Sequence, residues 1–280
     1  MSPNARRSSF APMELRDRFV VRTDKGINLA DWDPGETLGL EKESAVEKTE
    51  KSIARLDELQ YLMYAEHRHA LLVVLQGMDG AGKDGTIRHV MRGLNPQGCR
   101  VTSFKAPTAE EGDHDFLWRV HHAAPASGEV ALFDRSHYED VLAARVRNLV
   151  PKSVWSRRYD HINRFEQLLT DSGVVVAKFF LYISKDEQRR RFEERLREPT
   201  KQWKLSPSDF QDRKRWEDYV TAYEEALTRC STPDAPWFIV PADKKWFRNF
   251  VVSHILVETL EALDMRFPKP TFDVSRIELD

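Results

Sequence analysis

The stretch LLVVLQGMDGAGKDGTIRHV, residues 71–90, combines three local patterns that together decide the fold. It begins with an uninterrupted apolar run at residues 71–75, which predicts a buried strand. Residues 77–83 follow in the pattern G-x-x-x-x-G-K, and a helical pattern then places Ile87, Val90 and Met91 on one face. Strand, glycine-rich loop and helix in this order favour a phosphate-binding loop over an ordinary strand-to-helix turn.

Most residues of this loop are small, so its backbone can turn N–H groups inward around a phosphate. Besides one acid, the loop consists of Gly77, Met78, Gly80, Ala81 and Gly82. The start of the following helix adds the positive end of its dipole, and Lys83 adds a full charge. We therefore expect these residues to bind phosphate.

Two acids depart from the usual pattern of such loops. Asp84 follows Lys83, where Ser or Thr normally provides a hydroxyl for Mg²⁺. Asp79 lies inside the loop, where a phosphate would repel its carboxylate unless a cation lay between them. Our interpretation is that Asp79 helps to hold Mg²⁺ or the substrate chain in place of the missing hydroxyl. The alternative is that Asp79 is a solvated loop acid.

The composition bounds the class of protein. The chain has 280 residues, of which 41% are hydrophobic, so it can bury a core, and this argues against general disorder. A formal net charge of -2 argues against a nucleic-acid binder. There is no apolar run of ~20 residues and no apolar signal core at the N-terminus, so we expect no membrane partner and a cytoplasmic location. Cys99 and Cys230 have no metal-ligand spacing, and they fit a thiol-reducing compartment.

Alternation of strand and helix patterns predicts an α/β protein with a central parallel sheet. Further strands are expected at 101–104, 129–134, 174–183 and 237–240, and helices at 44–69, 108–120, 152–172, 206–230 and 244–263. The helices at 108 and 206 each begin with a capping box. We expect an N-terminal helical arm over residues 1–43, partly irregular, one kinase domain over 44–270 and a tail over 271–280.

The strand EVALFD, residues 129–134, ends in an acid, which fits the second acidic strand of P-loop kinases. Its end places Asp134 and Arg135 at the rim where open α/β sheets bind ligands. Asp134 could instead cap the next helix. Arg135 could clamp a phosphate or pair with Glu139, four residues further on.

A strongly basic segment, KDEQRRRFEERLREPTKQWK, occupies residues 185–204. Arg191 and Arg195 are four residues apart and share a helix face, whereas Phe192 and Leu196 mark the packed face. The alternative is a solvated helix with Arg–Glu pairs. After a P-loop and an acidic strand, we interpret residues 185–210 as a helical lid that closes over phosphates.

Several motifs together resemble the polyphosphate kinase 2 family. They are GMDGAGKDG at 77–85, FKAP at 104–107, FLWR at 116–119, FDRSHYEDVL at 133–142, QRRRFEERL at 188–196 and WK at 203–204. The resemblance implies Mg²⁺-dependent transfer of a terminal phosphoryl group between inorganic polyphosphate and adenine or guanine nucleotides, with Mn²⁺ as an alternative metal. It also implies a three-layer αβα P-loop kinase fold. The resemblance is greatest to the branch that accepts AMP as well as ADP.

The resemblance also implies roles for single residues. Lys83 and the loop would hold phosphates at the transfer point, and Asp79 and Asp134 would position Mg²⁺ and the acceptor phosphate. Arg135 would neutralise the transferring group, and Arg191 and Arg195 would be lid arginines. Four residues match further motif positions and are expected to bind phosphate or nucleotide: Asp84, Lys105, Arg119 and Glu139.

Two other functions compete with this prediction. An ATP-dependent nucleotide or small-molecule kinase of the same fold would not use polyphosphate, and Asp84 argues against it. A non-catalytic P-loop regulator would bind phosphates without turnover, and the joint presence of Lys83, Asp79, Asp134 and Arg135 argues against that function. The helix at 44–69 and several aromatic stripes also predict a homo-oligomer.

Overall fold

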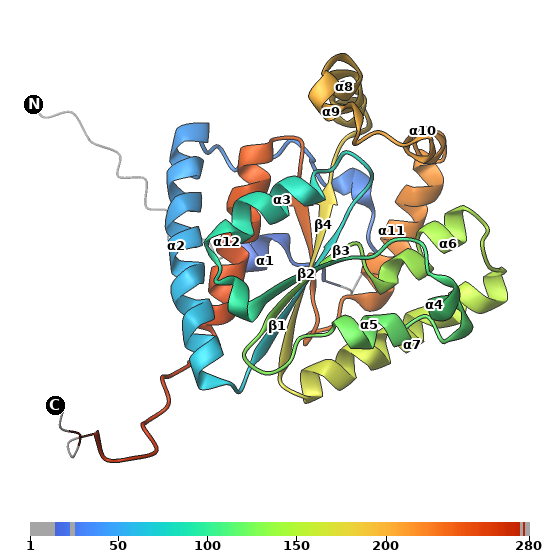
Figure 1. Cartoon of the computed structure of the whole chain (residues 1–280). Coiled ribbons are helices and arrows are strands. Elements are labelled where there is room, and N and C mark those ends of the chain that lie inside the picture. The colour runs from blue at the N-terminus through green and yellow to red at the C-terminus, as the bar shows by residue number, and fades with distance from the viewer. Residues whose placement is uncertain (1–14, 23–25, 275–276, 278–280) are drawn as a thin grey trace, which may run out of the picture.

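A parallel sheet of five strands forms the centre of the structure, a computed structural model that describes residues 15–22, 26–274 and 277. The strand order is β2-β3-β1-β4-β5 (Figure 1). Their bounds are β1 Ala70–Gln76, β2 Cys99–Ser103, β3 Val130–Asp134, β4 Val174–Tyr182 and β5 Trp237–Pro241. All neighbouring pairs are parallel, so every strand ends at the same edge of the sheet. The central strand β1 is buried along its whole length, as its apolar run predicts.

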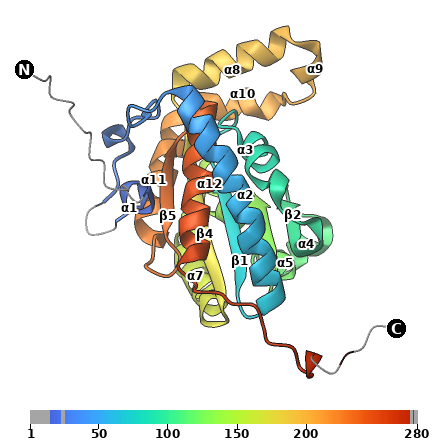
Figure 2. The ribbon, with the colours of Figure 1, turned by 90° about the vertical axis from the view of Figure 1, so that its left-hand side faces the viewer.

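Helices cover both faces of the sheet, which confirms the predicted three-layer αβα architecture (Figures 1 and 2). One face carries α1 Leu15–Phe19, α2 Lys42–Glu66, α3 Lys83–Val90 and α12 Lys245–Glu261. The other carries α5 Trp118–Ala123, α6 Ala143–Val146, α7 Lys152–Asp171 and α11 Trp216–Cys230. A short helix, α4 Ala109–Asp113, lies between β2 and α5.

Three helices lie above the carboxyl ends of the strands (Figures 1 and 2). These are α8 Lys185–Arg197, α9 Pro199–Gln202 and α10 Pro207–Lys214, hereafter the lid helices. α8 ends just before Pro199, because a proline disfavours helical geometry in the residue that precedes it. The prediction that Phe192 and Leu196 form the packed face of α8 is half wrong: Phe192 is 3% exposed, but Leu196 is 51% exposed. Phe192 lies against Gly80 of the P-loop, whereas Leu196 lies one turn further along the helix.

The predicted helix over residues 108–120 is divided into α4 and α5. Its predicted capping box between Thr108 and Glu111 is confirmed. The helix nevertheless ends after Asp113, because His114 is extended, with a ψ of 172°. The carboxylate of Asp115 then accepts a hydrogen bond from the backbone N–H of Leu117 at 2.9 Å, which starts a new turn.

The predicted helix over residues 206–230 is also divided, into α10 and α11. The capping box of Ser206 and Asp209 is confirmed. The break lies at Arg215, whose φ of -101° and ψ of 27° leave helical geometry. Its guanidinium donates to the carbonyl of Val146 at 2.6 Å, so a contact distant in sequence accompanies the break.

Part of the predicted N-terminal arm packs into the core. Leu15, Phe19 and Val21 are each less than 5% exposed. Val20 forms an antiparallel bridge with Phe238 of β5. Burial of this kind stabilises a segment that has little regular structure of its own. Residues 1–14 lie outside the described residues.

A buried charge network lies between β4, α7 and the turn that follows β3. Lys178 pairs with Glu166, and it donates to the Tyr138 hydroxyl at 3.0 Å. Glu166 accepts from the same hydroxyl at 2.9 Å and lies 3.1 Å from Nε2 of His137. Burial disfavours the carboxylate, but Lys178 and His137 together outweigh burial and hold the pKa of Glu166 below its ordinary value. The network therefore fixes the turn at residues 137–140.

Lys178→Met is expected to lower the free energy of unfolding by about 3–5 kcal/mol, because it leaves the Glu166 carboxylate buried without its counter-ion. Urea denaturation followed by circular dichroism measures this loss. The double variant Lys178→Met/Glu166→Leu removes both charges and should recover much of it. A single variant within ~1 kcal/mol of the wild type would contradict the assignment.

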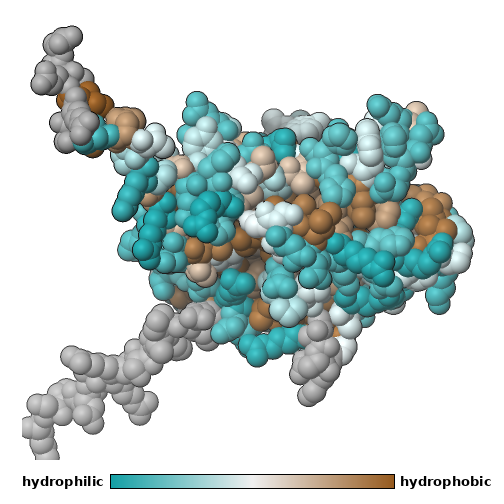
Figure 3. All heavy atoms as spheres, turned by 90° about the horizontal axis from the view of Figure 1, so that it is seen from below, coloured by the Kyte–Doolittle hydropathy of each residue, from teal (hydrophilic) through white to brown (hydrophobic). Residues whose placement is uncertain are grey.

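The face opposite the lid helices mixes hydrophobic with hydrophilic side chains (Figure 3). Dispersed apolar residues of this kind are ordinary on protein surfaces. Within the described ranges, the helices are too short or too polar to cross a membrane.

Candidate active site

The loop between β1 and α3 forms the predicted phosphate cradle. Gly80 and Gly82 have φ angles of 84° and 102°, in the left-handed region that favours glycine. A Cβ atom on Gly82 would lie 2.0 Å from Nη1 of Arg248, so a side chain does not fit there. Gly82 also precedes α3 without a capping side chain. The first backbone N–H groups of α3 are therefore available to an anion.

Gly82→Ala is expected to lower the free energy of unfolding by about 1–3 kcal/mol through backbone strain alone, with the clash against Arg248 in addition. Gly112→Ala is the matched control, because a Cβ atom at Gly112 of α4 would have nothing within 4 Å. The control should be neutral or slightly stabilising. Equal urea midpoints for the two variants would show that the P-loop does not need this conformation.

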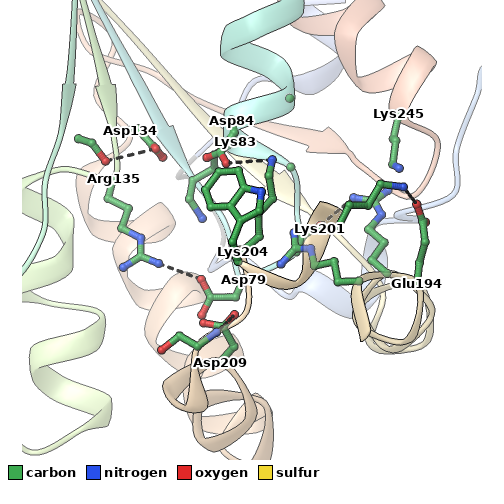
Figure 4. A pocket seen from close by; sticks show the side chains of 18 of the residues that line it. Asp79, Lys83, Asp84, Asp134, Arg135, Glu194, Lys201, Lys204, Asp209 and Lys245 are labelled. Carbon is green, nitrogen blue, oxygen red and sulfur yellow. Dashed lines mark hydrogen bonds and ion pairs between the residues drawn. The ribbon is translucent and has the colours of Figure 1, made fainter. Parts of the chain in front are cut away.

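A cavity of about 570 Å³ opens beside this loop, at the carboxyl edge of the sheet and beneath the lid helices (Figure 4). Its size is typical of a small-molecule site. The acids that line it are Asp79, Asp84, Asp134, Glu194 and Asp209. The cations are Lys83, Lys105, Arg135, Arg191, Arg195, Lys201, Lys204, Lys245 and Arg248. Nine cations against five acids make this a site for a strongly anionic ligand.

Lys83 and Asp134 meet in this cavity, as predicted. Lys83 begins α3, and its ammonium donates to the carbonyl of Gly77 at 2.7 Å. Asp134 ends β3 directly beside Leu75 of β1. One carboxylate oxygen of Asp134 accepts from the Ser103 hydroxyl at 3.4 Å. Its other oxygen, Oδ1, is buried without a hydrogen-bond partner in the described residues, so it suits a cation ligand.

Arg135 follows Asp134 in a left-handed conformation, with a φ of 63°, which is uncommon for a residue other than glycine. Its Nη2 donates to Asp79 Oδ1 at 2.9 Å, so its hydrogen bond goes to the P-loop acid and not to Glu139. Burial opposes the charge of Arg135, but Glu139 and Asp79 outweigh burial, and the pKa of Arg135 is raised. Arg135 therefore stays charged at the rim of the cavity.

Glu139, Gly77 and Met78 lie on the other side of the Asp79–Arg135 pair. They line a second cavity of about 40 Å³, enough for roughly one or two water molecules and too small for a nucleotide base. One orientation of the Gln76 amide gives hydrogen-bond partners to both its oxygen and its nitrogen. In that orientation the nitrogen donates to the carboxylate of Glu139 at 3.1 Å. Burial raises the pKa of Glu139, although Arg135 and Lys83 oppose that shift.

The two arginines of α8 differ in their partners. Arg191 is 4% exposed, and all five of its N–H groups have acceptors: Glu187 and the carbonyls of Gly80, Ala81, Ala242 and Asp243. Arg191 thus clamps the P-loop to the lid and to the end of β5. Arg195 lies with its guanidinium 5.6 Å from the centre of the Phe192 ring, and it has no hydrogen bond or ion pair within the described ranges. Arg195 is therefore the better placed of the two to receive a phosphate.

Some of the remaining predicted residues line the cavity, and the others contact the residues that line it. Lys105 lines the cavity. Arg119 does not line it, and it donates to the carbonyl of Lys105 at 2.8 Å from behind. Ala81 is buried within the loop. Asp84 lies 3.6 Å from the ammonium of Lys204, so it links α3 to the lid.

Several residues of the cavity wall were not among the predicted site residues, and three of them are Asp209, Lys245 and Arg248. Asp209 lies near Asp79 (Figure 4), and burial followed by repulsion from Asp79 raises its pKa. Lys245 and Arg248 lie on the first turn of α12, directly after the last strand. Their position after a parallel strand is a signal that could have identified them, because all such strands end at one edge.

Comparisons with known proteins identify the family of this chain. A family model described as Polyphosphate kinase 2 (PPK2) matches residues 39–268. An AMP/ADP-polyphosphate phosphotransferase from Meiothermus ruber is 51% identical over 265 residues, which cover 94% of this chain and 99% of that protein. An ADP-polyphosphate phosphotransferase from Rhodopseudomonas palustris is 47% identical, over 91% of this chain and 92% of that protein.

A solved structure is also similar along nearly the whole chain. The crystal structure of polyphosphate kinase 2 from Arthrobacter aurescens TC1 superposes with a TM-score of 0.88 at 44% identity, covering 91% of this chain and 92% of that one. The family match covers the P-loop, the end of β3, the lid helices and the start of α12. The chain therefore belongs to the polyphosphate kinase 2 family.

Proposed function

We propose that this protein transfers the terminal phosphoryl group of inorganic polyphosphate to AMP and ADP, and catalyses the reverse reaction. The observation that carries this proposal is a cavity that brings together Lys83, Asp134 and Arg135 and is lined by more cationic than acidic side chains. Both substrates are polyanions, so their mutual repulsion is the main obstacle to reaction. Phosphoryl transfer requires alignment and charge neutralisation more than covalent chemistry by the protein.

In the transfer itself, an oxygen of the nucleotide's terminal phosphate attacks the terminal phosphorus of polyphosphate. The bond from that phosphorus to its bridging oxygen breaks, and the chain leaves one unit shorter. Because phosphates are deprotonated, the nucleophile needs no general base. Lys83 and the amides at the start of α3 would hold the transferring group, and Arg135 would neutralise its charge.

We propose that Asp134 and Asp79 hold Mg²⁺, with Mn²⁺ as a substitute. The unpaired buried oxygen of Asp134 supports this assignment, because carboxylate oxygens are the ligands that both metals accept. A bound metal would neutralise the negative charge of the phosphate oxygens. Asp79 would also hold Arg135 in place through its 2.9 Å hydrogen bond.

The lid helices contribute cations that the P-loop lacks. Arg195, Lys201 and Lys204 line the cavity from above. Lys204 is half-exposed and pairs with exposed Asp84, and an ion pair that is open to water is weak and can exchange for a phosphate. We therefore assign these lid residues to the donor chain, and we assign Arg191 and Arg119 to support of the loops beside it.

The acceptor is tested by incubation of the protein with polyphosphate, Mg²⁺ and AMP, ADP or GDP, followed by chromatographic identification of the products. We favour AMP and ADP because the Meiothermus ruber relative is named for both. GDP belongs in the test because a Mycobacterium tuberculosis relative, 38% identical, is named a GDP-polyphosphate phosphotransferase. Appearance of ADP or ATP supports the proposal, and binding without any product would favour a regulator.

Homo-oligomerisation and a cytoplasmic location stay predictions. Exposed aromatic residues on α2 support self-association, since Tyr61 and Tyr64 are 58% and 45% exposed. Light scattering of the purified protein measures the oligomeric state.

A further inference from the structure

Arg248, in the first turn of α12, is a buried arginine whose hydrogen-bond partners are all neutral. It is 2% exposed. Its Nη1 donates to the carbonyl of Ala81 at 3.1 Å, and its Nε and Nη2 donate to the side-chain oxygen of Asn249 at 3.2 and 2.9 Å. In the part of the chain that the structure describes, no carboxylate forms an ion pair with Arg248. A guanidinium has five N–H groups, so two are left for another acceptor.

The surroundings of Arg248 increase the cost of its charge. Arg191 donates to the same Ala81 carbonyl, so two cations lie side by side behind the P-loop. Burial, and then repulsion from Arg191, lowers the pKa of Arg248 to about 9, so it is still charged at neutral pH. A buried charge without a counter-ion destabilises a protein. Arg191 has Glu187 as its counter-ion, whereas Arg248 has none in the described ranges.

Arg248 lines the cavity where the phosphates would bind. It lies against the start of α3, since Cβ atoms on Gly82 and Gly85 would lie 2.0 and 3.3 Å from its guanidinium nitrogens. Lys245, three residues earlier on the same helix face, lines the same cavity. In Figure 4, Lys245 lies on the other side of Lys83 from Asp134 and Arg135. The start of α12 thus places Lys245 across the cavity from Asp134 and Arg135, and it places Arg248 against the start of α3.

We infer that Arg248, together with Lys245, binds phosphoryl units of the donor chain beyond the unit being transferred, and that the donor provides the counter-charge that the protein lacks at Arg248. This inference rests on the proposed function. It separates two roles within one cavity: the Asp134 side acts on the unit in transfer, and the α12 side holds the rest of the chain. A purely structural role for Arg248, as a brace for Ala81, is the alternative.

The test measures the dissociation constant of inorganic tripolyphosphate, without acceptor, by isothermal titration calorimetry. Arg248→Met should raise that constant at least about tenfold, which corresponds to ~1.4 kcal/mol. Arg248→Lys, which retains a charge without the planar fork, should give an intermediate constant. The KM for ADP should stay at the wild-type value in both variants. The matched control is Arg55→Met, which removes an exposed arginine on α2 that pairs with Glu58 and Glu261.

An unchanged tripolyphosphate constant in folded Arg248→Met, equal to that of the control, would overturn the inference and favour a brace. If Arg248→Met does not fold, Lys245→Met decides, because the Lys245 side chain is exposed and forms no ion pair within the described residues. It should weaken tripolyphosphate binding severalfold, and an unchanged constant would overturn the inference. Failure of the wild type to use polyphosphate would instead refute the proposed function.

Discussion

Asp134→Asn is expected to lower turnover with polyphosphate by at least about a hundredfold. The substitution retains the shape of the side chain but removes the charge that would hold the metal. A loss of ~3 kcal/mol of transition-state stabilisation corresponds to more than a hundredfold in rate. Stability should not fall, because the variant removes the charge of a half-buried carboxylate whose buried Oδ1 has no hydrogen-bond partner in the described part of the chain. Measurement of kcat with saturating Mg²⁺, ADP and polyphosphate, beside urea denaturation, separates the two effects.

Asp57→Asn serves as the control, because this acid is exposed on α2 and does not line the cavity. It changes the net charge of the protein by the same amount as Asp134→Asn, and it should leave kcat unchanged. Turnover like that of the wild type in folded Asp134→Asn would show that this carboxylate does not act in transfer.

Lys83→Met should cause a loss of similar size, also at least about a hundredfold, in kcat/KM for polyphosphate. Lys83 is 8% exposed, and its ammonium lies at the P-loop carbonyl of Gly77, so its charge acts in a site largely shielded from water. Removal of the hydrogen bond to Gly77 should lower the free energy of unfolding by only about 1–3 kcal/mol. The variant is therefore expected to be folded and inactive.

Lys51→Met is the matched control, since Lys51 is an exposed lysine of α2 that pairs with Glu47. Its kinetics should match those of the wild type. If Lys83→Met lost activity only in proportion to its unfolded fraction, Lys83 would be a structural residue, and the P-loop assignment would be wrong.

Much of the central fold could be predicted because its signals are local. The run at residues 71–75, the glycines that follow it and the acid at the end of β3 each have their pattern within a few residues. Parallel pairing then places Asp134 beside Leu75 and brings Lys83 and Asp134 into one cavity. The capping boxes at Thr108 and Ser206 were predictable for the same reason.

The features that could not be predicted depend on contacts between distant residues. Arg215 lies at a helix break where its guanidinium contacts Val146. Leu196 has the same spacing as a residue of a packed face. It is nevertheless exposed, because α8 contacts the P-loop through Phe192, one turn earlier on the helix. Arg191 lines the cavity, as expected, but its donors serve Glu187 and carbonyls of the P-loop and of the residues after β5, which its place on a basic helix does not indicate. Arg248 is 167 residues from Ala81 of the P-loop in sequence, and only the fold brings the two together.

The proposed function depends most on which donor the cationic cavity accepts. The direct measurement is ³¹P NMR of the wild-type protein with Mg²⁺ and AMP, supplied with either long-chain polyphosphate or ATP as the only phosphoryl donor. The cavity, with its nine cations, is expected to form ADP from polyphosphate, with much slower formation from ATP. Rapid ADP formation from ATP, together with none from polyphosphate, would identify an ATP-dependent kinase and contradict the proposal.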